Sequence, residues 1–234
     1  MGIPILTVGA RVKTAFEASG HGGERPTSGY ETLFDVVEAP EIDKSVETID
    51  VSPINAKVTQ YAEGRQDPGG DKTITFNHTE DALGKWETLC ALAETYEAAG
   101  RRLWFEYVYP NSNRSYFWCG KPKSFGNSGI SGNSASQLNG HVVFKEDHGW
   151  DSHSQQISTT DTTKSVVKGS TATTTVSNAV GTVKVTSSNP AVATGAVATT
   201  TLTITGVDVG TAVLTLQDAN EDECKIVVTC TAGA

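Results

Sequence analysis

The chain has 234 residues, of which 37% are apolar and 19% charged, and its formal net charge is −9. This balance is typical of folded proteins and excludes a disordered or fibrous chain, and the length suggests two domains, since a typical domain holds roughly 100 to 150 residues. Residues 1–155 carry 14 basic and 21 acidic side chains without a cluster of Lys or Arg. This disfavours a surface that grips nucleic acid, because such surfaces match phosphates with clustered cations.

The first residues, Met1 to Leu6, lack the charged start and sustained apolar stretch of a secretory signal, and no apolar run reaches the length of a membrane span. We therefore expect a cytoplasmic product with no membrane association. Because thiols stay reduced in that compartment, free cysteines are the expected state.

Two of the four cysteines cannot pair within one strand. Cys224 and Cys230 flank an alternating run, so an extended chain would place their Cα atoms about 20 Å apart at ~3.3 Å per residue, beyond the ~7 Å limit for a disulfide. The spacing of Cys90 and Cys119 does not exclude a contact between them. In a reducing cytoplasm, however, we interpret these two cysteines as buried free thiols.

The first elements along the chain are strands and loops. Ile49 and Val51 alternate with polar neighbours, as do Ile74 and Phe76, which predicts a strand at each place. The polar stretch 61–71 between them is interpreted as a loop. Stretches 20–29 and 126–134, which are rich in Gly, Ser and Asn, are also predicted to be loops.

One helix is predicted between Thr79, a favourable N-cap, and Gly100, which can adopt the left-handed conformation that closes a helix. Arg101 and Arg102 follow beside its negative end. Apolar residues recur at three- and four-residue intervals: Leu83, Trp86, Leu89, Cys90, Ala93 and Tyr96. Charged residues occupy the other faces: Lys85, Glu87, Glu94 and Glu97. The helix should therefore cover a sheet with one face, with Leu83, Trp86, Leu89 and Tyr96 as its core anchors.

After the helix, residues 103–109 alternate in the manner of a strand, and the turn residues 110–114 lead into a second strand at 115–119. This pattern predicts a hairpin. A further short strand at 141–144 closes a sheet-rich domain with one helix.

The composition changes near residue 157. All of the aromatic residues precede Asp151, and the remainder of the chain is rich in Thr and Ser. The polar segment 151–161 is interpreted as a tether. The expected domains are therefore 1–155 and 156–234, both mainly β: a sandwich or barrel with one packed helix, then a small β-sandwich.

No catalytic or metal-binding pattern stands out. The histidines, at positions 21, 78, 141, 148 and 153, show no partners at metal-ligand spacing, and no phosphate-binding loop, dinucleotide fingerprint or nucleophile elbow is present. Because nothing provides a nucleophile with its base, we expect neither an enzyme nor a bound cofactor or metal.

The second domain resembles the bacterial immunoglobulin-like group 2 family. Residues 187–193 read Ser-Ser-Asn-Pro-Ala-Val-Ala, and a Gly-Val turn at 206–207 and a Gly-Thr-Ala strand opening at 210–212 follow. These three pieces match the family's pattern in order. The resemblance implies a small β-sandwich over about 160–234.

The first domain resembles the tail tube proteins of siphoviruses, in the lambda-like arrangement of a tube domain followed by one immunoglobulin-like domain. The resemblance rests on residues 47–52, 61–71 and 73–76, the helix, the 102–119 hairpin and the junction 163–170. It implies hexameric rings that stack into a tube, with DNA passing through the lumen without specific binding. The implied partners are copies of the chain and other tail proteins such as the tape measure and the terminator, in a virion tail assembled in the host cytoplasm.

The same resemblance implies that the 61–71 loop contacts neighbouring subunits or rings, with Tyr61, Glu63, Arg65, Asp67 and Asp71 as candidate contact residues. The alternative is a cell-surface or carbohydrate-binding module in which the immunoglobulin-like domain is the active part. The lack of aromatics in 158–234 disfavours it, because sugar binding commonly uses flat aromatic platforms.

Overall fold

The structure is a computed structural model that describes residues 9–44, 46–55, 57–66, 70–109, 112, 114–127 and 135–233. Its internal contacts divide the chain into two compact units, one made of residues 1–25 and 33–152 and the other of residues 26–32 and 153–234. The expected domain boundary, between residues 155 and 156, lies close to the break after Ser152. The assignment of residues 26–32 to the second unit was not expected.

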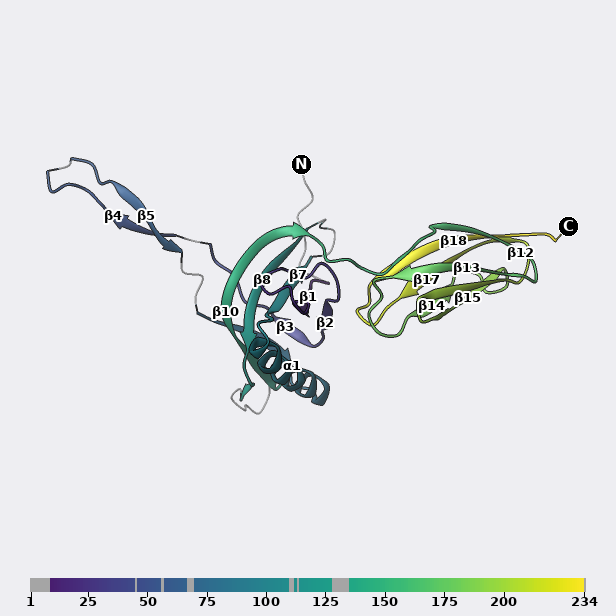
Figure 1. Cartoon of the computed structure of the whole chain (residues 1–234), viewed down its shortest axis with the longest axis horizontal. Helices are drawn as coiled ribbons and strands as arrows, with labels where there is room; N and C mark the ends of the chain where they lie inside the picture. Colours follow the sequence, from purple (N-terminus) through teal and green to yellow (C-terminus); the bar gives the residue numbers. More distant parts are fainter. Residues whose placement is uncertain are drawn as a thin grey trace. The chain divides into compact units, whose positions relative to one another are not determined.

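A curved eight-stranded sheet dominates the first unit, and Figure 1 shows that it forms a nearly closed barrel. The strand order is β2-β1-β7-β8-β10-β6-β3, and β9 pairs with β10. The strands are β1 (Arg11–Phe16), β2 (Glu31–Leu33), β3 (Val36–Glu38), β6 (Asp71–Asn77), β7 (Leu103–Val108), β8 (Arg114–Pro122), β9 (Gly126–Asn127) and β10 (Gln137–Ser152). A separate two-stranded sheet is formed by β4 (Val46–Asp50) and β5 (Tyr61–Gln66).

The helix α1 (Glu80–Ala98) begins and ends as the sequence predicts. The Thr79 hydroxyl accepts a hydrogen bond from the Ala82 N–H at 3.0 Å. At the other end Gly100 has a φ of 73°, and the N–H groups of Gly100 and Arg101 donate to the carbonyls of Glu97 and Tyr96. This pair of bonds closes the helix with a Schellman motif. No helix in the described parts of the chain is long and apolar enough to span a membrane.

The core of the first unit lies between the helix and one face of the barrel sheet. Antiparallel pairing puts Phe105 of β7 opposite Trp118 of β8, and their rings stack with centroids 4.3 Å apart. The other buried members of this core include Val12, Ile74, Phe76, Trp86 and Val142. The strand predicted at 141–144 is therefore only the middle of β10, whose 16 residues bend around the barrel through two register shifts on β8.

The second unit consists of two four-stranded sheets with orders β11-β13-β16-β15 and β12-β18-β17-β14. Their strands are β11 (Ser158–Thr159), β12 (Thr163–Val167), β13 (Thr171–Ser177), β14 (Lys184–Ser187), β15 (Ala193–Ala198), β16 (Thr201–Gly206), β17 (Gly210–Gln217) and β18 (Glu223–Thr231). Both sheets contribute aliphatic side chains to one core, in which Leu202, Ile204, Leu214 and Ile226 have no exposed surface. The fold is thus mainly β with one helix in the described residues, which confirms the predicted class.

The cysteines are free, as expected: Cys119 and Cys230 are buried, and Cys90 and Cys224 are half-buried. Burial raises the pKa of the Cys119 thiol to about 12 and, with Glu94 and Glu87 nearby, that of Cys90 to about 11. Both thiols therefore stay protonated and weakly nucleophilic at neutral pH.

Candidate assembly surface

The β4–β5 hairpin forms an arm, residues 46–66, that extends away from the barrel of the first unit (Figure 1). Its two strands pair in antiparallel register, with Ile49 opposite Ala62 and Asp50 opposite Tyr61. Beyond the ladder, Val51 donates to the Gln60 carbonyl at 3.0 Å. The two strands of the arm therefore hydrogen-bond to each other, and the outer edge of each strand pairs with no other strand in the described part of the chain.

Large apolar side chains are exposed along the arm: Val46, Ile49, Val51, Ile54, Val58 and Tyr61. Ile49 is 52% exposed and Tyr61 is 66% exposed. An isolated two-stranded hairpin is only marginally stable in water, and a concentration of exposed large apolar side chains commonly marks an interaction site. The arm therefore has the properties of a segment that a partner surface would stabilise.

Gly64 fixes where the two strands of the arm approach each other. A Cβ at this position would lie 2.6 Å from the Glu47 carbonyl oxygen and 3.3 Å from Cγ1 of Ile49. Because no side chain can occupy that space, the local pairing of β4 with β5 requires glycine at residue 64.

The interpretation of residues 61–71 as a loop is wrong, because Tyr61–Gln66 is strand β5 and Asp71 begins β6. Tyr61 and Glu63 lie exposed on the arm. Arg65 belongs to the same strand, although its side chain is outside the described part, and Asp67 lies outside the described residues altogether. Asp71 belongs to the barrel sheet, where its carboxylate pairs with Nδ1 of His141 at 2.9 Å. The five candidate contact residues therefore do not form one loop.

The predicted helix anchors all face the barrel core. Trp86 is 1% exposed, and its indole Nε1 donates to the Lys123 carbonyl at 2.8 Å. Leu83 and Leu89 are half-buried against the same core, and the Tyr96 ring meets Phe16 edge-on at 4.7 Å.

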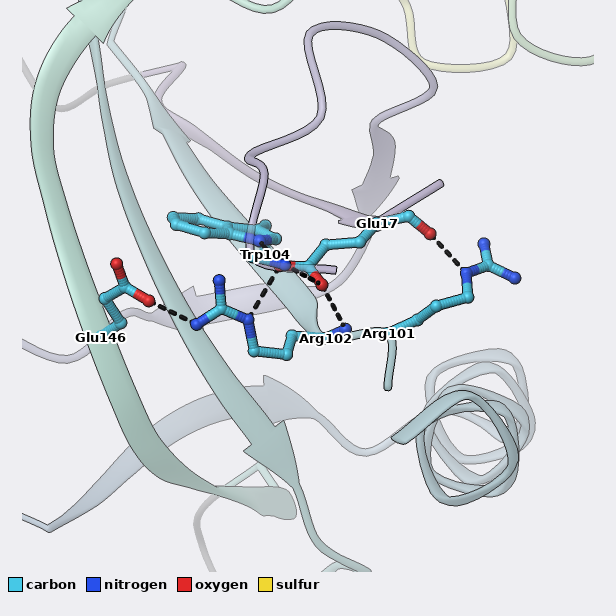
Figure 2. Close-up of polar contacts among 6 residues, drawn as sticks. Glu17, Arg101, Arg102, Trp104 and Glu146 are labelled. Carbon is cyan, nitrogen blue, oxygen red and sulfur yellow. Dashed lines mark hydrogen bonds and ion pairs between the residues drawn. The ribbon is translucent and has the colours of Figure 1, made fainter. Parts of the chain in front are cut away.

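A buried carboxylate, Glu17, connects the end of β1 to the start of β7 (Figure 2). Its Oε1 accepts hydrogen bonds from Nε1 of Trp104 at 2.9 Å and Nε of Arg102 at 2.8 Å. Its Oε2 accepts from the N–H groups of Gly23 and Arg102, both at 3.0 Å. The Arg102 guanidinium also pairs with Glu146, on β10.

The electrostatics of this cluster favour the ionised carboxylate. Burial by itself would raise the pKa of Glu17, but the hydrogen bonds from Trp104, Gly23 and Arg102 outweigh it and hold the pKa below its ordinary value of 4.5. With four donors on its two oxygens, Glu17 is a structural anion rather than a proton-transfer group.

Sequence reasoning missed the Glu17 cluster. Arg101 and Arg102 were assigned to the helix dipole, whereas Nε of Arg101 donates to the Glu17 carbonyl at 2.5 Å and Arg102 binds the Glu17 carboxylate. The sequence offers one signal for this cluster, the pair of arginines after the helix. That signal does not identify their partner, because Glu17 lies far away in the sequence.

We predict that Glu17→Gln lowers the free energy of unfolding by about 3 kcal/mol at pH 7, because it removes the buried partner of a charge pair. Since the folded-state pKa of Glu17 is lowered, its stabilisation is complete above about pH 4.5 and is lost as the pH falls through the folded-state pKa. Urea unfolding at pH 7 and pH 3.5, followed by tryptophan fluorescence, should show the gap between wild type and variant shrinking in acid.

The matched control is Glu24→Gln, since the Glu24 side chain is 74% exposed and its partner is the exposed His21. This variant should unfold like the wild type at both pH values. A Glu17→Gln gap that stays constant with pH would contradict the assignment of Glu17 as an ionised anchor.

Other site chemistry is limited within the described ranges. No group of three or more His, Cys, Asp or Glu side chains there could hold a metal ion. One hollow beside the helix, lined by residues that include Arg101, Lys121 and Cys119, has a volume of about 20 Å³, which is enough for about one water molecule. It is too small for a substrate or cofactor.

Comparison with known proteins adds no family to these observations: no protein-family model matches the chain, and no curated protein is significantly similar to it.

Proposed function

We propose that this chain is a structural subunit of the tail tube of a long-tailed bacteriophage, which polymerises as stacked hexameric rings. The observation that carries the proposal is the arm, a two-stranded hairpin separate from the other sheets, on which large apolar side chains are exposed in the part of the chain that the structure describes. A second copy of the chain is the partner that would bury them. When the arm of one subunit contacts a different surface of the next identical subunit, the repeated contact builds rings or filaments.

The barrel supports the same proposal. Its nearly closed β-sheet and the helix share one buried core, so the first unit is a folded body that could be repeated around a ring. Each ring would enclose a lumen through which DNA passes without specific binding. The excess of acidic over basic side chains in residues 1–155 fits this role, because a lining rich in Lys and Arg would hold the phosphates.

In this proposal the second unit is an immunoglobulin-like decoration of the tube. Its sequence motifs have structural roles that support the likeness. In the Ser-Asn-Pro turn, the Ser187 hydroxyl donates to the Ala193 carbonyl at 2.7 Å and the Asn189 side chain accepts from Ala191 at 3.2 Å. At Gly206 a Cβ would lie 2.8 Å from the Val167 carbonyl oxygen, so the close approach there requires glycine.

The proposal places the protein in the virion tail, after assembly in the host cytoplasm, beside tail proteins such as the tape measure and the terminator. Sedimentation velocity over a range of concentrations tests its first requirement. We expect rings or longer polymers to grow at the expense of the 24.7 kDa subunit. A chain that remains monomeric at all concentrations would contradict the proposal.

A further inference from the structure

By its contacts the strap, residues 26–32, groups with the second unit, although more than a hundred residues separate it from the rest of that unit and its last two residues, Glu31 and Thr32, are also the first two of β2. Its Tyr30 is 2% exposed. Residues 158–234 contain no aromatic residue of their own, so Tyr30 is an aromatic residue that the strap adds to the unit. At the other end of the strap, the Gln155 N–H donates to the Thr27 carbonyl at 2.8 Å.

The contact that identifies the strap is made by the side-chain amide of Asn220. Its Nδ2 donates to the Tyr30 carbonyl at 2.5 Å, and its Oδ1 accepts from the Thr32 N–H at 2.7 Å. In an extended chain, the carbonyl of one residue and the N–H two residues later point to the same side. The Asn220 amide, with a donor and an acceptor side by side, therefore binds the strap as the peptide group of a neighbouring strand would.

The loop that carries Asn220 holds this amide in place. The carboxylate of Asp218 accepts from the N–H groups of Asn220 at 2.8 Å and Asp222 at 3.1 Å through Oδ1, and from the Val180 N–H at 3.1 Å through Oδ2. Glu221 adopts a left-handed conformation, with a φ of 62°, which brings the chain round to Asp222. Asn220 itself is 3% exposed, so its amide is both buried and oriented.

We propose that the second unit carries a recognition site for an extended peptide backbone, built on Asn220, and that the strap is the segment that fills it. The recognition uses main-chain atoms, as when an extended peptide is added to a sheet edge, and burial of Tyr30 adds side-chain specificity. The second unit is complete only with the strap in place, so residues 153–234 alone are not the whole domain.

The test is reciprocal and uses the full chain. Asn220→Ala removes both amide hydrogen bonds, so the backbone N–H of Thr32 should exchange with deuterium at least about tenfold faster, while the amides of β7 and β8 are unchanged. Conversely, Tyr30→Ala should increase the labelling rate of the half-buried Cys224 thiol, near the start of β18 next to the Asn220 loop, by a thiol reagent severalfold, while Cys119 in the first unit labels as in the wild type.

The matched controls are Glu223→Gln just after the loop and Glu31→Gln in the strap, because both side chains are exposed. Both should behave as the wild type in both assays. Asn220→Asp keeps the oxygen that accepts from the Thr32 N–H and loses the N–H group that donates to Tyr30. The Thr32 amide should therefore exchange at a rate between those of the wild type and Asn220→Ala. This variant distinguishes loss of the recognition contact from general unfolding of the loop. The proposal is overturned if Thr32 keeps its protection in Asn220→Ala, or if Cys224 labelling does not respond to Tyr30→Ala.

Discussion

Replacing Trp86 with alanine is expected to lower the stability of the first unit by about 3–5 kcal/mol, a large share of the roughly 5–15 kcal/mol that a domain has. The indole is 1% exposed and packs against Phe76 and Phe125, with ring centroids 5.1 and 5.4 Å away. The indole of Trp86 packs directly over Gly140, where any side chain would collide with it, because a Cβ at residue 140 would lie 2.6 Å from the indole ring. Alanine would leave a cavity and remove the donor to the Lys123 carbonyl. Thermal unfolding of unassembled subunits by circular dichroism measures the loss.

Lys85→Ala is the matched control for this prediction. The Lys85 side chain is 56% exposed, and its ion pair with Asp81 is a surface pair one turn away on the same helix. Such pairs contribute about 0.3–0.5 kcal/mol, so the melting temperature should hardly change. Equal small shifts for the two variants would mean that the helix face carrying Trp86 is not the core face.

The second large effect is expected from the arm. Ile49→Asp places a charge among the exposed apolar side chains of the arm, and a charge buried at a contact without a partner is costly. We expect the variant to remain a folded monomer with an unchanged melting temperature. The equilibrium constant for its self-association should fall by more than about tenfold. Sedimentation and thermal unfolding, measured on the same preparation, separate assembly from folding.

Val37→Asp is the control for the arm variant, because Val37 is 51% exposed on β3, in the barrel sheet. This variant should assemble like the wild type. Assembly of Ile49→Asp into polymers of wild-type length would exclude the arm as the contact element.

Elements that depend on local signals could be predicted from the sequence. Thr79 and Gly100 mark the ends of the helix, and the alternation in 103–109 and 115–119 predicts the β7–β8 hairpin, because caps and periodicity act within a few residues. The arm could not be recognised in the same way. Its second strand reads Tyr-Ala-Glu-Gly-Arg-Gln, which shows no regular alternation of apolar and polar residues.

The contacts that sequence reasoning missed join residues far apart in the chain. Glu17 meets Arg102 and Trp104, and Asn220 meets Tyr30 and Thr32. In both cases the side chain on its own is an ordinary polar residue, and its role appears only when the fold brings a distant partner to it. A polar tether was predicted at 151–161, but β10 continues to Ser152 and the Ile157 side chain is already in the core of the second unit.

Electron microscopy of the purified, concentrated protein in negative stain tests the central claim most directly. The account predicts rings with sixfold symmetry and a central channel, stacked into tubes of constant diameter, and the loss of these tubes in Ile49→Asp. Images that contain only isolated subunits, or aggregates without rings, would contradict it.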